Sequence, residues 1–197
     1  MQYTPWDNRA DNWRILFPVQ PQSILHFWFE ELTTKQHFGK DTALDETIRA
    51  RFGETLEAAS RCELFAWRTT AEGRLAEIVV LDQFSRNIYR DTPRAFAQDA
   101  LALVLAQELV ASGQDRSLAV AQRVFAYMPF MHSESALVHA QAVTLFSQPG
   151  MENNLDFELR HKAIIDRFGR FPHRNATLGR TSCAEELAFL GEPGSSF

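Results

Sequence analysis

The sequence has few cysteines, no long apolar run and no excess of basic residues, and each absence excludes a class of protein. Its 197 residues include two cysteines, Cys62 and Cys183, too few and too far apart for a disulfide framework or a cysteine metal site. We expect both to be small, inert core side chains. The longest apolar run, Ala100 to Ala106, is far shorter than the roughly 20 residues of a membrane-spanning helix.

The charge balance and the missing motifs exclude further classes of function. With 20 basic and 25 acidic residues, the formal net charge is −5, which is atypical of nucleic-acid binders. The chain contains no zinc-protease motif, glycine-rich phosphate loop, serine elbow or dinucleotide fingerprint. Charges interrupt any early apolar run, so no secretory leader is predicted. We therefore expect a cytoplasmic protein that binds neither nucleic acid nor membrane and carries no metal and no cofactor.

The chain does contain a succession of helical patterns. Apolar residues recur at helical spacing, for example at Ile48, Phe52 and Leu56. No alternating run bounded by hairpin turns predicts a strand. We expect a single all-α domain of about eight helices in antiparallel pairs over residues 21–190. Residues 1–20 would form an N-terminal arm, and residues 191–197 a loose tail.

Caps and breakers predict where the helices begin and end. Asp41, Thr69 and Ser133 are the main candidate caps, Pro129 is a breaker, and residues 33–40 are a linker. Thr69 and Glu72 have capping-box spacing, and Ser182 and Glu185 repeat that spacing before the last helix. The expected helices span residues 21–32, 41–61, 69 through 84 and on to the turns of Arg86 and Arg90, 98–112, 116–127, 133–147, 153–168 and 182–190.

Asp82 is the most informative single residue, because it lies on the apolar face of the most apolar helix. A carboxylate there should be buried and paired, and Arg86 is one turn away. Arg90 lies a further turn along. Two interpretations stay open. Asp82 and Arg86 are an internal clamp, or Arg86 and Arg90, oriented by Asp82 and Asn87, bind a carboxylate or phosphate.

A second polar cluster follows Pro129. His132 precedes Ser133, the expected cap of the next helix, and Glu134 lies in the first turn of that helix, where negative charge suits the helix dipole. One interpretation is a hydrophobic turn with a surface histidine. The other makes His132 a proton carrier or a donor to a ligand beside the positive end of a helix.

The densest polar stretch is residues 167–175, where arginines, a histidine and an asparagine surround Phe168 and Phe171. Burial of the two phenylalanines would hold this loop against a core. His161 lies on the apolar stripe that leads into the loop, where a satisfied core histidine is the alternative. The candidate site residues are His132, Glu134 and His173 as catalytic groups, Arg86, Asn87, Arg90, His161, Arg170, Arg174 and Asn175 as ligand-binding groups, and Asp82 as an orienting group.

These clusters are predicted to meet in space. Each lies at or near a helix end, beside a proline. Because the chain reverses direction at each short link, the ends of alternate links lie on the same side of a helical array. At least one side-chain contact should therefore join residues 82–90 to residues 132–134 or 170–175.

The ordered motifs resemble a known bacterial family. Asp82-Gln83-Phe84-x-Arg86-Asn87, Met128-Pro129-Phe130-x-His132-Ser133-Glu134, and the segment from His161 to Leu178-Gly179-Arg180 are similar to the family catalogued as domain of unknown function 924. The resemblance covers about residues 21–190. It implies a tetratricopeptide-like helical array and no activity.

Two functions follow as hypotheses. The first is a pocket lined by arginine and histidine that binds a small phosphate- or carboxylate-bearing ligand; whether the pocket is also catalytic stays open. The second is a protein- or peptide-interaction module, in which the charged clusters only clamp the helices together. A deep pocket would favour the first, and complete mutual pairing of the charges would favour clamping.

Overall fold

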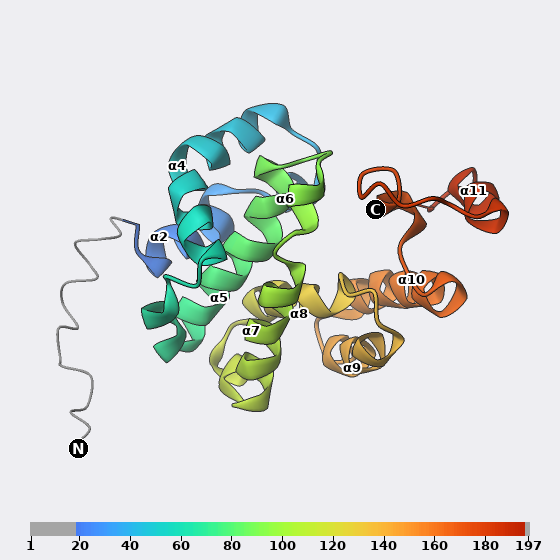
Figure 1. Ribbon diagram of the computed structural model, residues 1–197. Helices are drawn as coiled ribbons and strands as arrows, with labels where there is room; N and C mark the ends of the chain where they lie inside the picture. Colours follow the sequence, from blue (N-terminus) through green and yellow to red (C-terminus); the bar gives the residue numbers. More distant parts are fainter. Residues whose placement is uncertain (1–18, 196–197) are drawn as a thin grey trace, which may run out of the picture.

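The computed structural model describes residues 19–195, in which every regular element is helical (Figure 1). The all-α class is therefore confirmed, whereas the tetratricopeptide-like arrangement stays a prediction. Nearly all of the predicted N-terminal arm, and the last two residues of the predicted tail, lie outside the described residues. The α-helices are α2 (Pro21–His26), α3 (Thr34–Phe38), α4 (Thr42–Ser60), α5 (Ala71–Val79), α6 (Ser85–Ile88), α7 (Asp99–Ala111), α8 (Val120–Met131), α9 (Ala136–Phe146), α10 (Glu152–Phe168) and α11 (Ala184–Leu190).

Two wide, π-helical turns interrupt the α-helical geometry. Residues Phe27–Glu31 extend α2, and Val80–Phe84 join α5 to α6 without a break. Every side chain from Leu75 to Phe84 is buried, as the apolar pattern predicted. A π turn adds a residue to one helical turn and is frequent at functional sites. Asp82 lies within this turn, so its direction depends on it.

The main core is built from aromatic side chains around this central helix. The Phe52 ring stacks on Phe84 at 5.1 Å and tilts against Phe27 at 5.0 Å. Helix α8 packs on α5 and α7 and also on α9 and α10, and it lies between these groups in Figure 1. None of the described helices combines the length and apolar character that crossing a bilayer requires.

A second, much smaller core lies near the C-terminus. It contains Ile164, Ile165 and the completely buried Phe171, with Phe168 and Phe189 partly buried against them. The burial expected for Phe171 is confirmed, and that of Phe168 is partial. Because this core is small, polar contacts contribute much of what holds residues 171–180 to the rest of the molecule.

Two predicted boundaries near the second polar cluster are wrong. Pro129 does not end its helix but lies within the last turn of α8. Proline removes one backbone hydrogen bond, the one that an N–H at position 129 would donate to the oxygen of Phe125, and the burial of Met128, Phe130 and Met131 outweighs that loss. Ser133 does not cap α9, which begins after Ser135. His132 therefore closes α8 and does not adjoin the N-terminus of α9.

Other local predictions differ by smaller amounts. Asp41 caps α4 as expected, accepting from the backbone N–H of Ala43 at 2.9 Å. The cap of α5 is Thr70 and not Thr69, and residues 33–40 contain the short α3 in place of an open linker. The last helix begins after Cys183 and not Ser182. Both cysteines, expected in the core, are exposed.

Candidate functional site

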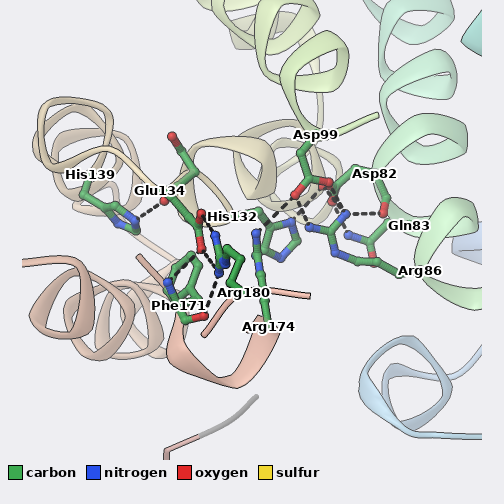
Figure 2. A network of polar contacts seen from close by, with 11 residues as sticks. Asp82, Gln83, Arg86, Asp99, His132, Glu134, His139, Phe171, Arg174 and Arg180 are labelled. Carbon is green, nitrogen blue, oxygen red and sulfur yellow. Dashed lines mark hydrogen bonds and ion pairs between the residues drawn. The ribbon is translucent and has the colours of Figure 1, made fainter. Parts of the chain in front are cut away.

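Segments far apart in the sequence meet in one polar network (Figure 2). Asp82 is completely buried. Its Oδ1 lies 3.0 Å from Arg86 Nη1 and 2.8 Å from Nδ1 of His132, fifty residues away. The expected burial of Asp82, its pairing with an arginine and its contact with the His132 segment are all confirmed.

Arg86 is held on several sides. Its Nη1 donates to the Asp82 backbone oxygen and to Asp99 Oδ1, both at 2.8 Å, and its Nη2 donates to Asp99 Oδ2 at 3.0 Å. Asp99 begins α7. Asp99 was not among the predicted site residues, because an acidic residue in a first helical turn is common and has no distinguishing neighbour. Both Nη atoms of Arg86 thus donate to groups of the protein itself.

Asp82 and His132 form an oriented acid–base pair. Burial alone would raise the pKa of Asp82, but Arg86 and His132 outweigh it and hold that pKa well below its usual range. Burial, and then the charge of Arg86, lower the pKa of His132. The imidazole is therefore neutral at pH 7, and Nδ1 carries the proton because a carboxylate can only accept. Its Nε2, which no described residue hydrogen-bonds, is left as a proton acceptor.

Arg174 is the least satisfied charge in the network. Its guanidinium carbon lies over two aromatic rings, 4.7 Å from the centroid of Phe96 and 4.5 Å from that of Phe171. The one hydrogen bond described for its guanidinium goes from Nη1 to Asp99 Oδ2 at 3.3 Å, and its Nε is buried with no partner among the described residues. Burial, and then the charge of Arg86, lower the pKa of Arg174 to about 10. The guanidinium of Arg174 is therefore not fully hydrogen-bonded within the described residues.

Glu134 holds residues 171–180, the C-terminal loop, in place. Its oxygens accept from Arg180 Nη1 and Nη2 at 2.6 and 2.9 Å and from the backbone N–H of Phe171 at 2.8 Å. Burial would raise the pKa of Glu134, but Arg180 and the Phe171 N–H lower it. Both carboxylate oxygens of Glu134 accept hydrogen bonds. These contacts favour a role in holding Phe171 and Arg180 in place over the catalytic role that we predicted for Glu134.

Arg180 was missed as a site residue, since only its place in the family motif distinguished it. Its Nε donates to Asn175 Oδ1 at 2.9 Å, and Asn175 in turn donates to Ser182 Oγ at 3.0 Å. These contacts favour a positioning role for Asn175, which we predicted to bind ligand. Together they fix the loop that presents Arg174.

Three histidines surround the buried ring of Phe171 at 5.5–6.1 Å between centroids: His139, His161 and His173. Burial lowers the pKa of His161 to about 3. Burial and the charge of Arg174 lower that of His173 to about 4. These two rings are therefore neutral at pH 7. In the described part of the chain, no three His, Cys, Asp or Glu side chains come together as metal ligands would.

The structure does not bring Asn87, Arg90 or Arg170 into this network. Asn87 and Arg90 donate to Asp45 at 2.7 Å, and Arg170 donates to Glu186 at 2.6 Å. The prediction assumed that the helix continues through Arg90, but α6 ends at Ile88, so Arg90 turns toward α4.

Asp45 could have been found from the sequence. It lies three residues before Ile48, at the head of the apolar stripe of α4, as Asp82 lies on the stripe of its own helix. The same reasoning therefore predicts a buried, paired carboxylate at both positions.

The ion pair of Asp45 should make the stability of the fold depend on pH. Burial raises the pKa of Asp45, but the hydrogen bonds from Arg90 and Asn87 leave it lowered. A lowered carboxyl pKa stabilises the fold above the unfolded value of 3.8 and loses that effect as pH falls through the folded value. Asp45→Asn should thus lower the free energy of unfolding at pH 7 by about 1.5–3 kcal/mol. The deficit should shrink toward pH 3 in urea titrations; a pH-independent deficit would contradict the pairing.

Comparison with known proteins places the chain in a family. Residues 24–194 match the family described as "Bacterial protein of unknown function (DUF924)". The chain is also similar to the solved structure of the Protein of Unknown Function ATU0120 from Agrobacterium tumefaciens, with a TM-score of 0.82 and 38% identity over 87% of this chain and 96% of that one. The search of curated proteins gave no match. With most of its length matched and the motifs around Asp82, His132 and Arg180 in place, the chain belongs to the DUF924 family of bacterial proteins.

Proposed function

We propose that this network binds a small anionic ligand through Arg174, with His132 as the proton acceptor beside it. The observation that carries the proposal is the state of Arg174. Its side chain is only 8% exposed, yet its guanidinium makes one hydrogen bond of 3.3 Å within the described chain. A buried charge is costly unless it is paired and hydrogen-bonded, and a bound anion would supply what is missing.

The other groups have supporting roles in this proposal. Asp82 holds the His132 ring so that Nε2 is the accepting atom, which is the arrangement of a carboxylate-oriented general base. Asp99 connects the two halves of the site, since it accepts from both Arg86 and Arg174. The chemistry that fits is removal of a proton from the bound anion or from a water molecule next to it.

The competing function is a protein- or peptide-interaction module whose charged clusters are clamps. It is favoured by the pairing of Arg86 and Arg180, each of which donates through both Nη atoms to a carboxylate, Asp99 and Glu134 respectively. Buried ion pairs of this kind are often structural. The two functions differ in what happens at Arg174 when an anion is added.

We expect small anions to stabilise the fold. At about 100 times the dissociation constant, a ligand that binds only the folded state adds about 2.7 kcal/mol, which corresponds to roughly 5–10 °C in melting temperature for a chain of this size. The measurement is thermal unfolding with acetate, phosphate or sulfate, against chloride at equal ionic strength to remove screening effects.

Two variants separate a site from a general charge effect. Arg174→Gln should abolish the stabilisation. Arg167→Gln is the matched control, because Arg167 also stacks on two phenylalanines, Phe168 and Phe189, but is 44% exposed and paired with Glu185. Equal melting temperatures in all the salts, or equal responses of the two variants, would reject anion binding and favour the clamp.

The proposed state of His132 can be measured directly. Nitrogen NMR of the histidine rings should show His132 neutral at pH 7 with the proton on Nδ1. His132→Asn, which can still donate to Asp82, should keep the anion-induced stabilisation. A charged ring, or a proton on Nε2 only, would exclude His132 as the proton acceptor.

A further inference from the structure

We infer that the ligand of this site is a monocarboxylate with an apolar body, and not a phosphate. This inference rests on the proposed function and names its substrate class. Three observations around Arg174 carry it: the guanidinium donors that have no described partner, the carboxylates that act on the guanidinium, and the aromatic character of the neighbouring side chains.

The donors left on Arg174 favour a planar partner. The guanidinium carbon lies over the rings of Phe96 and Phe171, 4.7 and 4.5 Å from their centroids, and Nε has no hydrogen-bond partner among the described residues. A carboxylate is planar and matches two parallel N–H donors of the guanidinium fork, which is the bidentate geometry that distinguishes arginine from lysine. A tetrahedral anion can also meet two donors, but its further oxygens lie outside the plane of the fork.

The charges around Arg174 also favour a ligand that carries a single negative charge. Arg86 and Arg180 each donate through both Nη atoms to a carboxylate, Asp99 and Glu134 respectively, whereas Arg174 makes a single described hydrogen bond of 3.3 Å. The carboxylates of Asp99, Glu134 and Asp82 all act electrostatically on Arg174. They would repel the second charge of a phosphate dianion, and both Arg86 and Arg180 already pair with a carboxylate of their own.

The surroundings beyond the guanidinium are aromatic. Phe171 is completely buried, whereas Phe96 is only partly buried. The ring of Phe96 also contacts Arg86, whose guanidinium carbon lies 5.6 Å from the ring centroid. An apolar group attached to a carboxylate would contact Phe96 and exclude water from the ion pair. Ligand sites of this kind are mostly apolar with few convergent polar groups.

The test is a comparison of anions that differ in one property at a time. Binding of acetate, benzoate, methanesulfonate and hydrogen phosphate is measured by calorimetry at pH 7.5 and equal ionic strength. Methanesulfonate separates shape from charge, because it is a tetrahedral monoanion. We expect acetate to bind more tightly than either tetrahedral anion by roughly tenfold, the value of about one charge-assisted hydrogen bond, and benzoate to bind more tightly than acetate.

Variants of the two contacting residues test the geometry. Arg174→Lys keeps the charge but loses the planar fork, so it should remove the preference for acetate over methanesulfonate. Phe96→Leu should weaken benzoate more than acetate, and because Phe96 is partly exposed, this variant should fold even if changes at Arg174 do not. Circular dichroism checks the fold of each variant.

The outcomes separate this inference from the proposed function. If phosphate binds at least as tightly as acetate and Arg174→Gln abolishes its binding, the anion site stands and the carboxylate class is wrong. If no anion binds in an Arg174-dependent way, both are wrong. Preference for acetate and benzoate, lost in Arg174→Lys, supports both.

Discussion

Replacing Asp82 by alanine is expected to lower the free energy of unfolding by about 3–5 kcal/mol, the range for removing one partner of a buried ion pair. The carboxylate is completely buried, and Arg86 and His132 both depend on it. Asp99 remains as a second partner for Arg86, which places the expected loss toward the lower part of the range. His132 would also lose its orienting acceptor.

Asp82→Asn should be less destabilising, because the amide oxygen can still accept hydrogen bonds from Arg86 and His132. The control is Asp156→Ala, which removes an exposed pair whose side chains are 61% and 59% exposed and should cost about 0–1 kcal/mol. Urea unfolding measures all three variants. An Asp82→Ala protein as stable as the parent would show that this carboxylate does not anchor the central helix.

His139→Ala is expected to produce the second large loss, also about 3–5 kcal/mol. His139 and Glu158 are both completely buried. His139 Nδ1 lies 2.7 Å from Glu158 Oε1, and its Nε2 donates to the backbone oxygen of Ser133 at 2.8 Å. Glu158 Oε2 has no partner within the described part of the chain. Without His139, neither oxygen of this buried carboxyl would be hydrogen-bonded.

The loss should grow as the pH rises. Burial raises the pKa of Glu158 above its ordinary value of 4.5, and His139 opposes that rise. In His139→Ala the opposition is gone, so the folded-state pKa moves further up. A carboxyl with a raised folded pKa favours the fold below the unfolded value and loses that effect as pH rises through the folded value. Urea unfolding at pH 5 and pH 8 should show a larger deficit at pH 8.

Two further variants give this prediction its controls. Glu158→Gln in the His139→Ala background removes the titrating group, so the extra loss of stability between pH 5 and pH 8 expected for His139→Ala should be absent from the double variant. His26→Ala changes a histidine whose side chain is 67% exposed and should have little effect. A deficit for His139→Ala that is equal at both pH values would contradict the assignment to Glu158.

The sequence by itself determined the features that depend on short-range spacing. The helical period is visible in the chain, so the all-α class and the buried helix carrying Asp82 could be predicted. A carboxylate on the apolar face of that helix must be paired, and Arg86 is within reach four residues later. The meeting of Asp82 with the His132 segment followed from the reversal of chain direction at short links.

Local signals failed where tertiary packing outweighed them. Pro129 was expected to end a helix, but burial of its neighbours keeps α8 intact. Ser133 and Ser135 are both able to cap α9, and spacing alone does not choose between them. Arg90 was placed by extending a helix that ends at Ile88, so its partner was not foreseen.

Only the tertiary structure decided which partners meet across the network. Asp99 and Arg174 are seventy-five residues apart, and Glu134 and Arg180 forty-six. No spacing rule joins positions so distant, because their contact depends on how α7, α8 and the C-terminal loop pack. The contacts of Arg174 with the rings of Phe96 and Phe171, and the burial of its Nε without a hydrogen-bond partner among the described residues, arise from that packing alone.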